Sequence, residues 1–221
     1  MAIKRILEPE VMESDEDARD YNAMDHADVN RLFVDDLLAA GFMGGDVLDL
    51  GTGTALIPVE LCRRVENCRV MAVDAAVSML DLARFNVEAA GLIERIELQQ
   101  VDAKNMGYAD GMFDVVVSNS IVHHIPDPIE CLREAVRVTR PGGTLFFRDL
   151  LRPASEQELG QLVQTYTGEE NEHSQQMFAE SLHAALALEE VRDLIQSLGF
   201  DPAGVDQNSD RHWTWHGIKA E

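Results

Sequence analysis

The chain has 221 residues, of which 46% are hydrophobic and 26% charged, a composition that fits a globular domain and excludes a disordered or fibrous protein. It carries 40 acidic residues against 18 basic ones, for a formal net charge of −22. Because such a chain repels phosphate groups, we expect it to bind neither nucleic acid nor an anionic membrane surface.

The cysteines and the apolar runs indicate the compartment. Cys62, Cys68 and Cys131 are odd in number and lack the spacing of metal ligands. No apolar run reaches the length of a signal-peptide core or a membrane span. We therefore expect a cytoplasmic protein with reduced thiols. Without an internal repeat or linker, residues 1–221 are expected to form one domain.

A helical leader is expected over residues 1–45, where apolar residues three and four apart predict an amphipathic helix at Asp28–Ala40. Over residues 46–150, β-branched apolar runs alternate with segments of helical period, which predicts a parallel sheet between helices. The predicted strands are Asp46–Leu50, Arg69–Asp74, Ile96–Val101, Phe113–Ser118 and Thr144–Asp149. The predicted helices are Leu56–Val65, Val77–Ala90 and Pro128–Val138.

The last part of the chain begins with more helix than one crossover needs. We expect residues 151–186 to form an insertion over the carboxyl edge of the sheet, either as a cap or as a dimer contact. Residues 187–221 are expected to add a last helix that ends at Gly199, followed by two strands, Ala203–Gln207 and His212–Lys219.

A glycine-containing turn follows the first predicted strand, in the sequence Asp49-Leu50-Gly51-Thr52-Gly53-Thr54. Glycine tolerates positive φ and lets a ligand approach the backbone, and the helix beyond the turn offers free amides to an electronegative group. This pattern favours a nucleotide-like cofactor over an ordinary tight turn.

Two further acids stand at predicted strand ends. Asp74 ends the second strand, 25 residues beyond Asp49, where a carboxylate can accept hydrogen bonds from both hydroxyls of a ribose. Asp102 follows the third strand and can meet the amine of an adenine, with Ala103 leaving room for the ring. Because the carboxyl ends of parallel strands meet at one edge of a sheet, these acids predict one adenosine site.

Over residues 28–150 the chain resembles the class I S-adenosylmethionine-dependent methyltransferases. The motifs that carry the resemblance are Asp49–Thr54, Asp74, Asp102-Ala103, Phe113–Asn119 and Arg140–Leu145. The resemblance implies an α/β fold with a Rossmann-like seven-stranded class I methyltransferase sheet, helices on both faces, an N-terminal helical leader and a helical insertion after strand five. It also implies S-adenosylmethionine as cofactor and S-adenosylhomocysteine as product. Ala55 departs from the pattern, because many members carry a third glycine there.

By the same resemblance, Asp49 and the backbone of Gly51–Gly53 face the methionine part of the cofactor. The expected cofactor-binding residues are Asp49, Gly51, Thr52, Gly53, Asp74, Ala75, Asp102, Ala103 and Asn119. A nicotinamide dinucleotide is the rival cofactor, but Leu56 replaces the third glycine of its pattern. A carboxylate at Asp49 would also repel a pyrophosphate, whereas it attracts an ammonium group.

The catalytic candidates follow from the reaction that the resemblance implies. Methyl transfer from a sulfonium is an in-line displacement, and a general base helps where the acceptor is a hydroxyl or a thiol. His123 and His124 follow the fourth strand and are candidate bases, with packing in the cofactor pocket as the alternative. Neighbours point apart on a strand and no third ligand is evident, so we expect no metal site. Tyr21 could cover the sulfonium, or could anchor the leader.

The candidate acceptor-binding residues lie at the end of the fifth strand, just after it and in the insertion: Arg148, Asp149, Arg152 and His173. A guanidinium can pair with a substrate carboxylate or phosphate, or with acids of the chain itself. We therefore predict methyl transfer to a small molecule. The alternatives are a protein that binds the cofactor without transferring methyl, and a methyltransferase that acts on a basic protein. A homodimer is a further expectation that the sequence leaves open.

Overall fold

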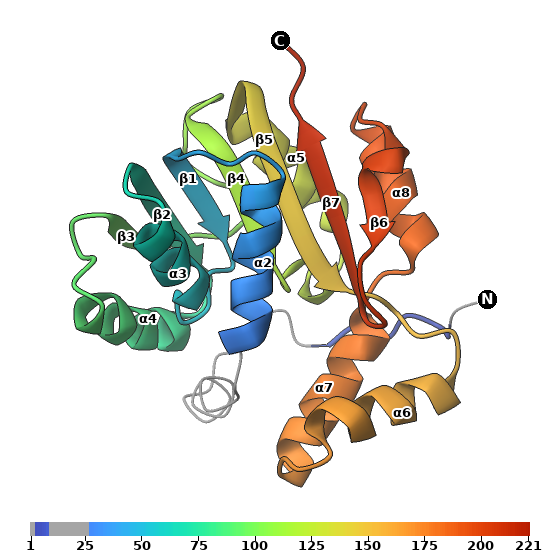
Figure 1. Cartoon of the computed structure of the whole chain (residues 1–221). Helices are drawn as coiled ribbons and strands as arrows, with labels where there is room; N and C mark the ends of the chain where they lie inside the picture. Colours follow the sequence, from blue (N-terminus) through green and yellow to red (C-terminus); the bar gives the residue numbers. More distant parts are fainter. Residues whose placement is uncertain (1–2, 9–26) are drawn as a thin grey trace.

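A seven-stranded sheet forms the centre of the computed structural model, which describes residues 3–8 and 27–221 (Figure 1). The strand order is β3-β2-β1-β4-β5-β7-β6. The strands are β1 (Gly45–Leu50), β2 (Cys68–Asp74), β3 (Ile96–Gln100), β4 (Phe113–Asn119), β5 (Thr139–Leu150), β6 (Val205–Gln207) and β7 (His212–Ile218). Strands β1 to β5 pair in parallel, and β7 runs antiparallel to both of its neighbours. The expected α/β fold with seven strands is confirmed.

Helices cover both faces of this sheet. They are α2 (Ala27–Ala39), α3 (Leu56–Arg64), α4 (Val77–Ala89), α5 (Pro128–Val138), α6 (Glu156–Thr167), α7 (Glu172–Ala184) and α8 (Leu188–Ser197). Two short 3₁₀ turns complete the described elements, η1 (Val122–His124) and η2 (Pro202–Gly204). Among the described helices, none is long and apolar enough to cross a membrane.

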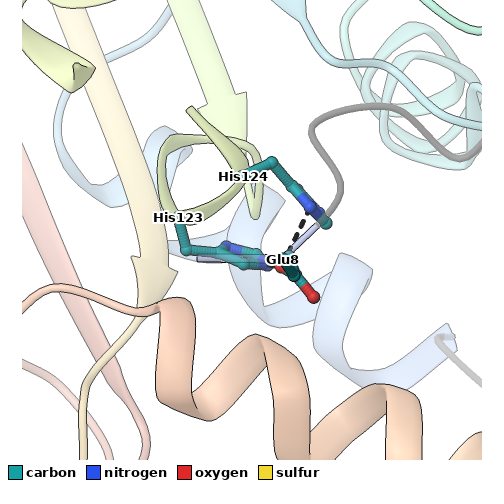
Figure 2. A group of neighbouring side chains, drawn as sticks. All are labelled: Glu8, His123 and His124. Atoms are coloured by element: carbon teal, nitrogen blue, oxygen red, sulfur yellow. Dashed lines mark ion pairs between the residues drawn. The ribbon is translucent and has the colours of Figure 1, made fainter. Parts of the chain in front are cut away.

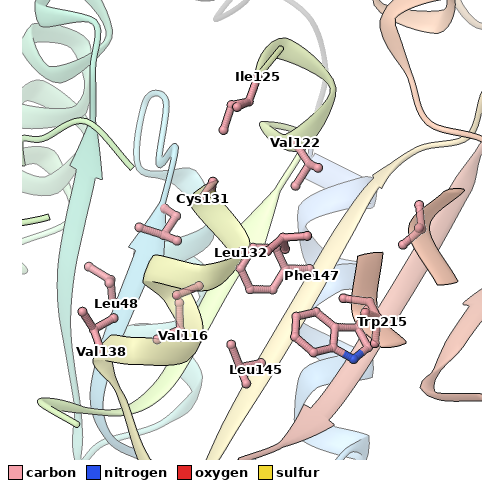
Figure 3. Packing of buried hydrophobic residues seen from close by; sticks show 14 of the residues in the cluster. Leu48, Val116, Val122, Ile125, Cys131, Leu132, Val138, Leu145, Phe147 and Trp215 are labelled. Carbon is pink, nitrogen blue, oxygen red and sulfur yellow. The ribbon is translucent and has the colours of Figure 1, made fainter. Parts of the chain in front are cut away.

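Two hydrophobic cores lie on opposite sides of the central strands. Val47 of β1 packs into the core under α2, α3 and α4. The next residue, Leu48, packs into the second core, under α5 and α8, part of which Figure 3 shows. Successive side chains of a strand point to opposite faces, so a strand buried on both sides is apolar at nearly every position. Trp213 and Trp215 stand two positions apart on β7, so they share one face of the sheet, and both lie in the second core.

The fifth strand begins earlier than the sequence predicts. It starts at Thr139, and its pairing with β4 shifts register between Phe113 and Val115. Arg140–Gly143 precede the strand predicted from Thr144 and therefore lie inside β5, at this irregularity. A Cβ atom at Gly143 would lie only 2.8 Å from the carbonyl oxygen of Asp114. Because glycine has no side chain, β4 and β5 can approach closely there.

The strand order reverses between β1 and β4, which places a crevice at the carboxyl ends of these neighbouring strands. The predicted insertion is present as α6 and α7, which lie side by side near this edge (Figure 1). Residues 3–8 also reach this region, because the amide of Ile6 donates to the carbonyl of His183 at the end of α7 (3.1 Å).

Candidate functional site

The glycine turn after β1 forms one wall of the crevice. Gly51 has φ +67°, and a Cβ there would overlap the side chain of Ile121. Both the backbone conformation and the lack of space therefore favour glycine at this position. Ala55, which departs from the sequence pattern, also adopts a left-handed conformation, with φ 59°. That conformation explains why glycine is favoured at this position, while the buried Ala55 still fits.

Asp74 ties the glycine turn to the end of β2. One carboxylate oxygen accepts the amide of Gly53 and the other accepts the amide of Ala76, each at 2.9 Å. Burial raises the pKa of Asp74, and these amide bonds oppose that rise. The carboxyl thus has a positioning role in addition to its predicted contact with a ribose.

A cavity of about 290 Å³ opens at this edge. The predicted cofactor residues that line it are Gly51, Gly53, Asp74, Ala75, Asp102, Ala103 and Asn119. Asp102 is half exposed, and its carboxylate accepts the amide of Lys104 at 2.9 Å. Burial alone would raise the pKa of Asp102, but the amide and ammonium of Lys104 hold it below its ordinary value.

Asp49 and Thr52 line a second, smaller cavity. Asp49 is only 2% exposed, and its Oδ2 accepts the hydroxyl of Thr52 at 2.6 Å. Burial raises the pKa of Asp49 to about 7; the Thr52 hydroxyl opposes this rise and the charge of Asp74 adds to it. A cation in this cavity would favour the ionised form of the carboxyl at neutral pH.

The two cavities share Gly51 and Asn119 as lining residues. Asn119 Oδ1 is buried and has no hydrogen-bond partner among the described residues. A buried unpaired acceptor is costly unless a ligand supplies a donor. These groups fit an S-adenosyl cofactor that spans both cavities. Asp49 could hold its ammonium, Asp74 could hold its ribose, and the unpaired Asn119 Oδ1 lies where the cavities meet.

The two histidines lie on η1 and have different surroundings. His123 is buried, and its Nδ1 is hydrogen-bonded to Asp149, whose other oxygen accepts the amide of Val122 at 2.5 Å. Burial alone would lower the pKa of His123, but the charge and hydrogen bond of Asp149 raise it. Only His124 lines the larger cavity.

Glu8 contacts both histidines from the N-terminal segment (Figure 2). Its Oε1 lies 3.0 Å from His124 Nδ1 and 3.4 Å from His123 Nε2, and its Oε2 accepts the hydroxyl of Ser181 on α7 at 3.0 Å. Burial would raise the pKa of Glu8, but His124 and His123 lower it. Sequence reasoning missed this residue, because nothing in its local pattern signals a partner 115 positions away.

The predicted acceptor-binding residues do not converge. Arg148 is buried against α2, where it pairs with Asp36 at 2.5 Å, and Arg152 pairs with Glu190 at 2.6 Å. Asp149 faces His123. His173 is exposed on α7, and Tyr21 lies outside the described residues.

Residues 48–147 match the family model of the methyltransferase domain. Methyltransferase GfsG of Streptomyces halstedii is 33% identical over 49% of this chain and 38% of its own length. The ubiquinone/menaquinone biosynthesis C-methyltransferase UbiE of Klebsiella pneumoniae subsp. pneumoniae is 29% identical over 72% of this chain and 67% of its own length. The chain spans half or less of the first curated relatives that it matches.

Solved structures share the fold. A candidate S-adenosyl-L-methionine-dependent methyltransferase from Methanococcus maripaludis superposes with a TM-score of 0.75, at 17% identity, over 98% of each chain. At that identity the likeness shows the fold alone. It extends beyond the matched domain to the N-terminal and C-terminal elements.

Proposed function

Because the chain contains a class I methyltransferase domain, we propose that it transfers a methyl group from S-adenosylmethionine to a small-molecule acceptor by in-line displacement. The observation that carries this proposal is the cavity at the carboxyl ends of β1 to β4, with Gly51, Asp74 and Asp102 in its wall. The net charge of −22 favours a small or cationic acceptor over nucleic acid.

The lining residues would hold the cofactor by its charged and polar groups. Asp49 would face the ammonium of the methionine part, which would keep this carboxyl ionised. Asp74 would accept the ribose hydroxyls, since a carboxylate has about four lone-pair sites and the two loop amides use only two of them. Asp102 and Ala103 would take the adenine. When bound, the cofactor supplies the electrophilic methyl on its sulfonium.

His124 is the histidine that we propose to contact the acceptor, since it lines the larger cavity whereas His123 does not. His123 would act as a positioning residue, held by Asp149 beneath the turn. Arg148 and Arg152 would stabilise the fold through Asp36 and Glu190.

The proposal is tested by calorimetric titration of the protein with S-adenosylmethionine and S-adenosylhomocysteine. We expect both to bind, and we expect Asp74→Ala to weaken each by at least about tenfold, because a charge-assisted hydrogen bond is lost. Glu97→Ala removes an exposed carboxylate from β3 and is the matched control. Absence of binding by the wild-type protein, or equal binding by Asp74→Ala, would refute the cofactor site.

A labelled-methyl assay over metabolite pools then separates an enzyme from a protein that only binds the cofactor. Transfer to a small-molecule fraction is the expected result. Labelling confined to basic proteins would replace the small acceptor by a protein substrate. Binding without any transfer would support the non-enzymatic alternative.

A further inference from the structure

Glu8, His123 and His124 form a compact cluster between the N-terminal segment and η1 (Figure 2). We propose that this cluster binds a divalent transition-metal ion through Glu8 Oε1, His123 Nε2 and His124 Nδ1. One potential ligand atom from each of the three residues lies within 4.8 Å of those from the other two. The proposed site adjoins the cofactor cavity through His124, and it does not depend on the proposed methyl transfer.

The spacing of the ligand atoms fits a coordination sphere. Two ligands each about 2.1 Å from a tetrahedral zinc ion lie about 3.4 Å apart, and the corresponding separation in an octahedron is about 3.0 Å. Glu8 Oε1 lies 3.4 Å from His123 Nε2 and 3.0 Å from His124 Nδ1. One ion can therefore contact Glu8 and either histidine with little movement of the side chains.

The surrounding residues orient the three ligands. His123 Nδ1 is hydrogen-bonded to Asp149 and Nε2 faces Glu8, so a neutral His123 with its proton on Nδ1 would offer the Nε2 lone pair to a metal ion. A carboxylate on the far nitrogen of a ligating histidine is the usual outer partner in metal sites. Ser181 Oγ donates to Glu8 Oε2, which leaves Oε1 as the free ligand atom.

Two of the proposed ligand atoms have no hydrogen-bond partner outside the cluster. Glu8 Oε1 and His124 Nδ1 are buried, and neither makes a hydrogen bond of acceptable geometry to a described residue. The Glu8 side chain is only 8% exposed. Buried polar atoms without partners are rare in native proteins and commonly indicate an ion or a water.

The geometry removes the two reasons for which the sequence predicts no metal. His123 and His124 lie on a 3₁₀ turn and not on a strand, and their ring centroids are 4.1 Å apart. The third ligand comes from Glu8, in a segment held by Arg5. The Arg5 guanidinium donates to the carbonyls of Ala184 (2.7 Å) and Ile125 (3.0 Å), so it joins this segment to α7 and to the residues after η1.

Two imidazole nitrogens and one carboxylate oxygen suit zinc, cobalt or iron(II), whereas magnesium and calcium prefer all-oxygen sites. Three protein ligands leave at least one position for water or for an acceptor oxygen. An ion on His124 Nδ1 would leave the proton on Nε2. His124 could then donate a hydrogen bond into the cavity but could not act as a base.

Cobalt titration of tag-free protein, first stripped with a chelator, tests the site. We expect one Co²⁺ per chain, with a visible d–d absorption, and competition by Zn²⁺. Glu8→Gln keeps the shape of the side chain and removes the anionic ligand, so we expect it to weaken binding by at least about 100-fold. Asp149→Asn removes the outer partner and is expected to weaken binding about 10- to 100-fold.

Glu156→Gln is the matched control, because Glu156 pairs with His183 at 3.6 Å but is 71% exposed and is not part of the cluster. It is expected to bind Co²⁺ as the wild type does. The proposal is overturned if folded wild-type protein takes up no Co²⁺, or if Glu8→Gln binds it as tightly. S-adenosylhomocysteine titration of the same samples reports the cofactor site separately, so failure of one site is distinguished from failure of the other.

Discussion

Replacement of Asp49 by Asn is expected to stabilise the free protein and to weaken cofactor binding. The pKa of Asp49 is raised by burial from an ordinary value of 3.8 to about 7. Between these two pH values the unfolded chain has released the proton that the folded protein still holds, so stability falls as pH rises. Above pH 7 the full cost is reached, about 4 kcal/mol at 1.36 kcal/mol per pH unit.

Asn has nearly the same shape as Asp but does not ionise, so the variant does not bear the cost of a buried charge at this position. At pH 8 we expect Asp49→Asn to raise the free energy of unfolding by up to about 4 kcal/mol. At pH 5 the cost in the wild type is smaller, and the gain should be about 3 kcal/mol less than at pH 8. Urea unfolding of the cofactor-free proteins at both pH values measures this difference, and contributions of other groups cancel in the comparison.

The same variant should bind the cofactor poorly. Loss of one hydrogen bond to a charged group costs about 1.5–3 kcal/mol, or roughly 10- to 100-fold in the dissociation constant of S-adenosylhomocysteine. Calorimetric titration at pH 8 measures this dissociation constant for the variant and for the wild type. An equal stability change at both pH values would show that the carboxyl has an ordinary pKa. Unchanged affinity would show that Asp49 does not face the ammonium.

Two further predictions concern the glycine turn and the N-terminal segment. Gly51→Ala is expected to lower the free energy of unfolding by at least about 3 kcal/mol, since left-handed φ costs 1–2 kcal/mol and overlap with Ile121 adds to it. Gly91 has φ +69° and open space around it, so Gly91→Ala should lower the free energy of unfolding by only about 1–2 kcal/mol. Urea unfolding measures both variants, and equal losses of stability would contradict the packing argument. Arg5→Ala should speed hydrogen exchange at the amides of residues 3–8, because it removes the contacts of Arg5 with Ala184 and Ile125. Replacement of the exposed Lys4 by Ala should leave this exchange unchanged. Protection that survives Arg5→Ala would mean that other contacts hold the segment.

The sequence was informative wherever a function depends on residues that are close along the chain. Asp49 and Gly51 belong to one strand and one turn, so their spacing alone predicts a ligand site. Asp74 and Asp102 are separated from them, but each stands at the end of a strand, and parallel topology brings strand ends together. Five of the seven strands, β1 to β4 and β7, were predicted to within one residue at each end.

Side-chain direction and distant contacts could not be predicted in this way. Arg148 and Asp149 are neighbours on a strand, so they point to opposite faces, and the sequence does not tell which face meets the crevice. The structure places Arg148 against Asp36 and the ring of Phe33, with its guanidinium carbon 5.6 Å from the ring centroid. Glu8 was missed because its contacts depend on how the N-terminal segment docks on η1 and α7.

The contact of Gly51 with Ile121 has a thermodynamic consequence. Ile121 immediately precedes η1, so the glycine turn rests directly on the residues that carry both histidines. We expect a ligand that displaces the glycine turn also to move this 3₁₀ turn, because close-packed groups transmit such movements. Any coupling between binding at the glycine turn and binding at the histidines must have the same factor in both directions.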